Sequence, residues 1–304
     1  MIELLAASIR IATPLALAAL GGILSERAGV FAVGLEGMML AGAFTAMLGA
    51  SSTGEPVVGI LLALLGGGFI GLVVAIVAVR FRANQMVSGL AVNVVALGLT
   101  SFLARAILVD GRPISLHLSP LAPLPVPVLS ALPVVGPLLF TQPPLTYLTI
   151  VGCVIVTFVL NRTQIGLTLR ATGENPEAVF ASGADPLTVR MLAVVACGAI
   201  AGLGGAVLTL QQVGTFTDGL TSGRGYLALA ALIVGRWTPW GAAAACLAFG
   251  AAEAFELRLQ SFGVPVSSYV VQMVPYLIAL AVLAGIGPSS KLPAAIGTAG
   301  PTNR

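Results

Sequence analysis

The sequence has 304 residues, of which 58% are hydrophobic and only 8% are charged. Soluble domains carry about 25% charged residues, so this composition excludes an ordinary soluble fold. The net charge of +3 is small and the arginines are scattered, which argues against a nucleic-acid partner. Long apolar runs recur, each able to cross about 30 Å of hydrocarbon. We therefore predict an all-α polytopic membrane protein, a single domain over residues 1–304 embedded in the lipid bilayer, with about 8–10 transmembrane or re-entrant helices.

The first apolar run, Leu4–Leu24, predicts a transmembrane helix. The next stretch, Ser25–Ala43, is apolar overall but contains Glu26, Arg27 and Glu36 together with four glycines. Backbone that leaves a helix at membrane depth is tolerated only where protein covers it or a cavity adjoins it. We therefore predict a broken or re-entrant segment. Glu36 in this segment either lines a transport pathway, caps unwound backbone, or pairs with Arg27.

Two clear spans follow, Val57–Val79 and Gln85–Leu108, and they are separated by Arg80 and Arg82. The positive-inside rule places this arginine-rich turn in the cytoplasm. Asn93 lies in the middle of the second span. An amide at that depth either hydrogen-bonds to a neighbouring helix or contacts a polar solute, so Asn93 is a candidate pathway residue.

Residues 110–144 differ in kind from the rest of the chain. They contain nine of the nineteen prolines and the single histidine, His117. Proline removes backbone donors and breaks helices, so this stretch cannot form a regular span. We predict an external excursion that dips into the interface around Val126–Leu139. It serves either as a covering loop or as a contact for an external partner, and one isolated histidine predicts neither a metal site nor a catalytic site.

A long polar interruption, residues 161–190, lies between two spans in the second half of the chain. Its middle predicts a short helix, because Asn175 is a preferred N-cap, Pro176 suits the first helical position and Glu177 suits the positive end of the helix dipole. Gly183 can close that helix. The stretch follows the return span, so it lies on the cytoplasmic side. We interpret it as a docking element.

The next helix should begin at Asp185–Pro186 and continue outward through Met191–Leu210. Arg190 either flanks the docking contact or anchors the cytoplasmic interface. Gln211 and Gln212 lie at the outer end of this span, where an uncharged polar solute would enter. They are candidate pathway residues.

The polar segment Gln211–Arg224 should connect two spans on the outer side. Asp218 and Arg224 flank its glycine-rich part, either as contacts for an external protein or as ordinary solvated residues. The apolar segment Gly225–Gly235 is short for a span, which predicts a half-helix that either crosses or re-enters. Two further spans follow, Trp240–Phe255 and Ser267–Gly285. Arg236 interrupts the apolar run, with Glu253 as a candidate partner.

Four segments in this order resemble the permease subunits of ABC importers, in the branch that serves ribose-type and nucleoside substrates. They are GLEGMML at 34–40, GENPEA at 173–178, TSGRG at 221–225 and ALAALIVGRWTPWGA at 228–242. The resemblance covers Ile11–Gly285, and this combination looks most like the nucleoside permeases. It implies the ABC importer permease fold in a bacterial cytoplasmic (inner) membrane.

The resemblance also implies partners. A second, similar permease subunit, an ABC ATP-binding subunit and an extracytoplasmic solute-binding protein are expected. The chain lacks the Walker A pattern GxxxxGK[ST], so ATP and Mg²⁺ should bind at the partner ATPase, and no cofactor should bind here. Residues 170–187 resemble the cytoplasmic coupling helix that transmits ATPase closure to the flanking spans. Its expected contact residues are Arg170, Gly173, Glu174, Asn175, Pro176, Glu177 and Gly183.

Several functions remain open on the sequence alone. No cluster of lysine or arginine suits an anionic solute, so a neutral nucleoside fits, and a ribose-type sugar fits equally well. A branched-chain amino-acid permease is the alternative within the family. An autonomous secondary transporter would use intramembrane acids such as Glu36 and Glu253. A membrane enzyme would need a cluster of acid–base or metal-binding residues, which the sequence does not offer.

Overall fold

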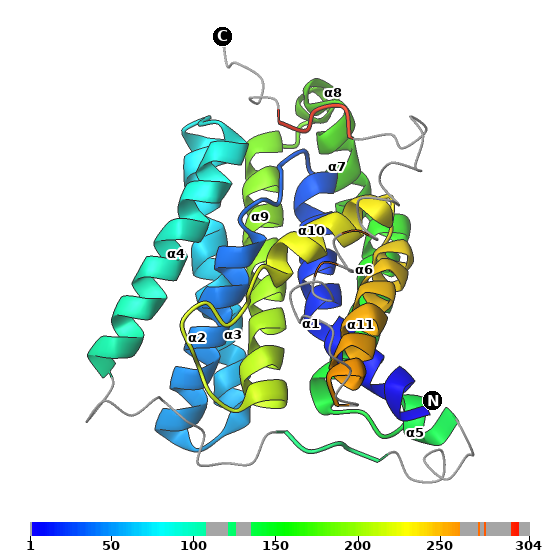
Figure 1. The fold of residues 1–304 in the computed structure, drawn as a ribbon. Coiled ribbons are helices and arrows are strands. Elements are labelled where there is room, and N and C mark those ends of the chain that lie inside the picture. Colours follow the sequence, from blue (N-terminus) through cyan, green and yellow to red (C-terminus); the bar gives the residue numbers. More distant parts are fainter. Residues whose placement is uncertain are drawn as a thin grey trace.

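The computed structural model describes residues 2–107, 121–125, 135–261, 273, 277 and 293–297. Its long helices pack into one bundle, with the short helices α5 and α8 at opposite ends (Figure 1). The helices are α1 (Ile2–Arg27), α2 (Leu35–Thr53), α3 (Pro56–Val74), α4 (Gln85–Ile107), α5 (Val135–Leu139), α6 (Pro144–Arg162), α7 (Gln164–Glu174), α8 (Pro176–Ala181), α9 (Pro186–Ala206), α10 (Arg224–Val234) and α11 (Pro239–Ser261).

Five of the described helices are long and apolar enough to cross a membrane. They cover Glu3–Arg27, Pro56–Arg80, Gln85–Ile107, Pro144–Arg162 and Pro186–Val213. Helices α3 and α9 each continue into a π-helical stretch, Ala75–Arg80 after α3 and Val207–Val213 after α9. The prediction of an all-α polytopic membrane protein is therefore confirmed. The predicted last span, Ser267–Gly285, and most of the proline-rich stretch lie outside the described residues.

Proline sets the first residue of many of these helices. Helices α3, α6, α8, α9 and α11 begin at Pro56, Pro144, Pro176, Pro186 and Pro239. The first turn of a helix has no intrahelical acceptor for its N–H groups, so the missing donor of proline costs nothing there, and its fixed φ suits the helix. The sequence thus marks helix starts directly, including those of α6, α8 and α9, which lie before, within and at the end of the polar interruption.

The centre of the bundle is held by close backbone approach between α3 and α9. A Cβ on Gly67 would lie 2.3 Å from the carbonyl oxygen of Gly198, and a Cβ on Gly198 would lie 2.4 Å from that of Gly67. No larger residue fits either position without moving a helix. Lipid tails are as apolar as leucine, so such van der Waals contact replaces the hydrophobic effect as the force that joins helices in a membrane.

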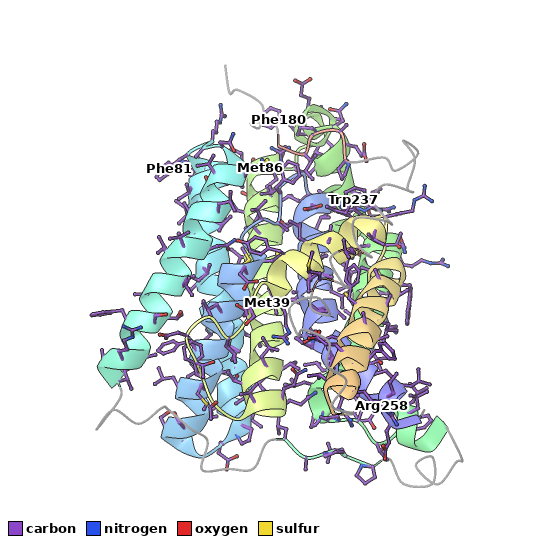
Figure 2. All side chains as sticks on the ribbon, in the orientation of Figure 1. Met39, Phe81, Met86, Phe180, Trp237 and Arg258 are labelled. Carbon is purple, nitrogen blue, oxygen red and sulfur yellow. The ribbon has the colours of Figure 1, made fainter. Side chains whose placement is uncertain are left out.

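The arginine-rich turns lie at one end of the bundle. Figure 2 shows Phe81 and Phe180 at this end and Arg258 at the opposite end. Phe81 is flanked by Arg80 and Arg82, and Phe180 belongs to α8. The two segments predicted to be cytoplasmic therefore share an end, which we call the α8 end, and the positive-inside rule assigns it to the cytoplasm.

Two interruptions divide the bundle within the membrane. Residues 28–34 are not helical and separate α1 from α2, as predicted for the Ser25–Ala43 stretch. Helix α10 begins midway along the bundle rather than at an end (Figure 1). Its 11 residues span about 16 Å, roughly half of the hydrocarbon thickness. The prediction of a half-helix is confirmed, and the irregular segment 214–223 together with α10 completes the crossing toward the α8 end.

The described part of the proline-rich stretch lies at the end opposite α8 (Figure 1). The backbone N–H of Leu121 donates to the carbonyl oxygen of Leu210 at 2.9 Å, and that of Leu124 donates to the carbonyl oxygen of Gln142 at 3.1 Å. These bonds satisfy backbone at the end of the α9 continuation and before α6. Residue His117 lies outside the described residues.

The α3–α9 contact yields a test. Gly67→Ala should lower the thermal unfolding midpoint of the purified protein, because overpacking a tight contact costs about 1–3 kcal/mol. The matched control is Gly98→Ala, since a Cβ on Gly98 meets nothing within 4 Å. Equal midpoints for the two variants would contradict the packing argument.

Candidate translocation and coupling sites

Helix α8 is built as the sequence predicts. The Asn175 side chain accepts a hydrogen bond from the backbone N–H of Ala178 at 3.1 Å, which caps the start of α8. Gly183 follows the helix with φ of +90°, a conformation that glycine adopts without strain. Asp185 then caps α9 by accepting from the N–H groups of Leu187 and Thr188. Both predicted caps are confirmed.

The ionised form of Asp185 maintains the second cap. Its pKa is held below the ordinary value, chiefly because the Thr188 hydroxyl donates to the carboxylate at 2.6 Å. The carboxylate is therefore charged at neutral pH. Because the pKa of Asp185 is lower in the folded protein than in the unfolded chain, the ionised cap stabilises the fold fully at pH values above the unfolded-state pKa. This stabilisation is lost as the pH falls through the folded-state pKa.

The residues predicted to meet an ATPase divide into two groups. Glu174, Asn175 and Glu177 are exposed, and so is the neighbouring Phe180, which is 60% exposed. Gly173 is buried instead, and a Cβ on it would lie 2.2 Å from the carbonyl oxygen of Arg27. Gly173 thus joins α7 to the end of α1 and does not contribute to the exposed surface.

Arg170 lies with Gly173 on the inner side of α7. It is half-buried, and its Nε donates to the carbonyl oxygen of Gly166 at 3.4 Å. Arg27, Arg170 and Trp237 line the same small cavity. Of the residues predicted for docking, Gly173 is therefore buried and Arg170 half-buried, and a docking role for the exposed ones stays a prediction.

Arg190 is buried, with only 2% of its surface exposed. Its Nε donates to the carbonyl oxygen of Ala28 at 3.2 Å, and its guanidinium also donates to that of Ala295 at 3.5 Å. The N–H of Ala295 in turn donates to the carbonyl oxygen of Gly173 at 2.8 Å. Its burial contradicts the expected anchor at the cytoplasmic interface, and Arg190 instead joins the start of α9 to the non-helical stretch 28–34.

At the second interruption, Glu36 caps the start of α10. Its Oε1 accepts from the Thr221 hydroxyl at 2.6 Å and from the N–H of Gly223 at 2.8 Å, and its Oε2 accepts from the N–H of Gly225 at 2.6 Å. A Cβ on Gly225 would lie 2.5 Å from the Glu36 Cα, so only glycine permits this approach. Of the alternatives, capping of unwound backbone is what the geometry shows.

Asn93 connects both interruptions to α4. Its Oδ1 accepts from the N–H of Gly37 at 2.9 Å, and its Nδ2 donates to the carbonyl oxygen of Val33 at 2.9 Å and to the Tyr226 hydroxyl at 3.0 Å. The side chain is 6% exposed. Both amide protons are therefore used within the protein, as the interhelical alternative predicted.

The charged residues near the interruptions pair differently from expectation. Arg27 donates to the carbonyl oxygen of Trp237 at 3.0 Å rather than to Glu36. The Trp237 indole is 3% exposed and donates to the carboxylate of Glu26. This network fixes the turn between α10 and α11 to the end of α1. Because it joins residues about 210 positions apart, the sequence offered no local signal for it.

Arg224 lies at the first position of α10, not in an outer loop, and it forms an ion pair with Glu253. The proposed pair between Arg236 and Glu253 is therefore wrong. Asp218 forms an ion pair with Arg105 at 2.9 Å, with side chains 45% and 75% exposed. This hydrogen bond holds the pKa of Asp218 below its ordinary value. Exposed pairs contribute little to stability. The role of Asp218 as a contact for an external protein stays a prediction.

The two glutamines at the end of the α9 continuation contact other helices. Gln211 donates from Nε2 to the Thr146 hydroxyl at 3.2 Å, and Gln212 donates to the carbonyl oxygen of Arg10 at 2.9 Å. Among the described residues, no donor reaches the buried Oε1 of Gln211. These residues join α9 to α6 and α1, well away from Glu36 and Asn93 along the bundle.

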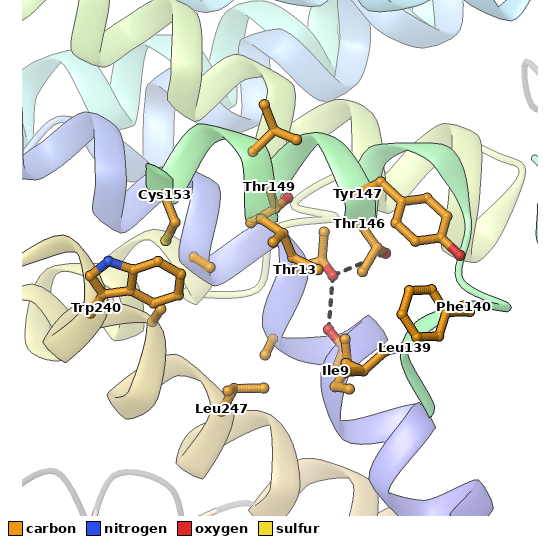
Figure 3. Close-up of a pocket in the computed structure, with 15 residues that line it drawn as sticks. Ile9, Thr13, Leu139, Phe140, Thr146, Tyr147, Thr149, Cys153, Trp240 and Leu247 are labelled. Carbon is orange, nitrogen blue, oxygen red and sulfur yellow. Dashed lines mark hydrogen bonds between the residues drawn. The ribbon is translucent and has the colours of Figure 1, made fainter. Parts of the chain in front are cut away.

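A cavity of about 490 Å³ lies between α1, α6 and α11 (Figure 3). Its lining is almost wholly apolar, with Trp240 at one side and Phe140 at the other. The hydroxyl of Thr13 is occupied by the Ile9 carbonyl oxygen and by Thr146. The cavity includes none of the predicted pathway residues, and its almost wholly apolar walls do not suit a hydrophilic solute. Within the described ranges, no group of three metal-ligating side chains occurs.

The cap on α10 yields a second test. Glu36→Ala leaves the Thr221 hydroxyl and two backbone N–H groups without an acceptor, which costs about 1–3 kcal/mol for a buried donor. The thermal midpoint should fall clearly, and Glu36→Gln, which keeps one acceptor oxygen, should fall less. Glu55→Ala, at an exposed residue between α2 and α3, is the control. A Glu36→Ala variant as stable as this control would contradict the capping role.

Comparison with known proteins places this geometry in a family. The family model described as "Branched-chain amino acid transport system / permease component" matches residues 4–290. The chain is 35% identical to the guanosine ABC transporter permease protein NupQ of Bacillus subtilis, over 94% of this chain and 92% of that protein. It is 35% identical to the nucleoside ABC transporter permease protein NupC of Lactococcus lactis, over 90% and 88%.

A third relative carries a different solute name. The putative glucose ABC transporter permease protein TsgC13 of Haloferax volcanii is 34% identical, over 85% of this chain and 78% of that protein. No solved structure matches the chain. The family match covers nearly all of the sequence, and these three relatives align with 85–94% of it. The chain therefore belongs to the family of ABC transport system permease components.

Proposed function

We propose that this chain is the membrane-spanning subunit of an ATP-driven importer that carries nucleosides into the cell. Relatives named for guanosine and nucleoside transport, each 35% identical over at least 90% of the chain, support this solute class. A multi-pass protein of the bacterial cytoplasmic membrane agrees with the five spans. The relative named for glucose and the family description define the competing solutes.

The proposed complex contains four kinds of component. A second homologous permease subunit pairs with this chain, an ABC ATP-binding subunit docks beneath the pair, and an extracytoplasmic binding protein delivers the solute. ATP and Mg²⁺ bind at the ATPase, and this chain holds no cofactor. The exposed α8 at the arginine-rich end, capped by Asn175, supports a docking surface formed by Glu174, Asn175, Glu177 and Phe180.

The observation that carries the mechanism is the buried Arg190. It bonds to Ala28 at one interruption and lies on α9 directly after the coupling segment, whose Gly173 packs on Arg27. Closure of the ATPase dimer would displace α7 and α8 as a rigid body. Since α6 precedes and α9 follows that body, both spans would tilt and switch the central pathway between outward and inward access.

The solute class is tested by ATP hydrolysis in the reconstituted complex with its binding protein. Nucleosides should stimulate hydrolysis several-fold, whereas ribose and branched-chain amino acids should leave the basal rate unchanged. Stimulation by a sugar alone would replace the nucleoside with the competing solute and leave the architecture intact. Transport by the purified chain without any ATPase would overturn the importer itself.

The docking surface is tested by Glu174→Ala/Glu177→Ala and by Phe180→Ala. Loss of an anchoring aromatic side chain costs about 2 kcal/mol or more at an interface centre, which corresponds to weaker ATPase binding by about thirtyfold. Copurification of the ATPase and solute-stimulated hydrolysis should both decrease. Glu55→Ala, at the opposite end of the bundle, should behave as wild type. Normal coupling in both α8 variants would contradict the proposed surface.

A further inference from the structure

We infer that Tyr226 contacts the solute, with its ring stacked on the nucleobase and its hydroxyl donating a hydrogen bond to it. This inference rests on the proposed function and names the residue that recognises the solute. Tyr226 is the third residue of α10, and 41% of its surface is exposed. It therefore stands where α10 begins, midway along the bundle (Figure 1).

The depth of Tyr226 favours a transport site. Discontinuous helices that start within the membrane are where transporters commonly build solute sites, because unwound backbone and helix ends supply polar groups there. The start of α10 is such a place, and α2 begins beside it at Leu35, held by the Glu36 cap. Irregular backbone at this depth must be covered by protein or adjoin a cavity.

Two of the polar residues predicted for the pathway, Asn93 and Glu36, already bond to groups of the protein. Asn93 uses both amide protons and its oxygen on protein groups, and Glu36 accepts three hydrogen bonds from the start of α10. These two residues shape the site, so recognition of the solute falls to a neighbouring residue. Tyr226 is the neighbour that Asn93 holds in place.

The Tyr226 hydroxyl retains a free donor. Its oxygen accepts from Asn93 Nδ2 at 3.0 Å, so its own proton points elsewhere. A phenol both donates and accepts, and no acceptor for this proton occurs among the described residues. Asn93 is itself fixed by Gly37 and Val33, so the ring is pre-organised rather than free to rotate away.

The chemistry of the ring selects a base-bearing solute. Every nucleobase presents a π-face, and stacking on an aromatic side chain is independent of base identity. Carbonyl oxygens and ring nitrogens of a base accept the phenol proton. A pentose has no planar ring to stack, so Tyr226 would distinguish a nucleoside from the sugar that it contains.

The test uses the assembled permease–ATPase complex in proteoliposomes with the solute-binding protein. Tyr226→Leu removes the ring, Tyr226→Phe removes only the hydroxyl, and Phe69→Leu removes an exposed aromatic side chain from α3. Uptake and equilibrium binding of radiolabelled adenosine and guanosine are measured, with ribose as the competitor that lacks a base. Thermal midpoints identify any variant that fails to fold.

The expected result distinguishes direct solute contact by Tyr226 from a purely structural role. Tyr226→Leu should weaken binding of both nucleosides by about tenfold or more, on the scale of a lost base–aromatic stack, while Tyr226→Phe loses less and Phe69→Leu loses nothing. Wild-type nucleoside affinity in Tyr226→Leu would overturn the inference. So would equal losses of affinity in Tyr226→Leu and Tyr226→Phe that are accompanied by lower thermal midpoints. Either result would leave nucleoside import standing. A wild-type complex that imports sugars or amino acids but no nucleoside would overturn both.

Discussion

The structure depends on one constraint, which is that backbone leaving a helix inside the membrane must find hydrogen-bond partners within the protein. Glu36 meets this constraint by accepting from Thr221, Gly223 and Gly225. A carboxylate suits the site because the first N–H groups of a helix carry partial positive charge. Asn93 extends the same solution to the N–H of Gly37. Together these bonds allow a discontinuous helix at a depth where a solute must pass.

A second set of contacts connects the two interruptions to the cytoplasmic end of the bundle. Arg190 binds the stretch after α1, Gly173 packs against Arg27, and Arg27 binds the turn that carries Trp237. The proposed coupling segment, the first interruption and the turn after α10 are therefore connected by direct contacts. The proposed ATPase push on α8 would reach the start of the pathway through packed and hydrogen-bonded groups, which requires no flexible linker.

Much of the fold could be predicted because its signals are local. Pro176 at a helix start, the Asn175 cap and the Asp185 cap follow from the needs of free N–H groups, and each is confirmed. Partner choice among charged residues could not be predicted. Glu253 lies near Arg236 in sequence but pairs with Arg224, since helix packing decides which side chains meet. The burial of Arg190 was missed for the same reason.

The sequence by itself determined the membrane class, the helix starts, the two interruptions and the family, because hydrophobic length, proline positions and short motifs are properties of the chain alone. Only the tertiary structure decided which polar groups are already satisfied. For both Glu36 and Asn93, a pathway role and a structural role remained open until their partners were known. A side chain is available to a solute only after the folded protein has met its own hydrogen-bonding needs, and Tyr226, 41% exposed at the start of α10, is the residue that we propose for that contact.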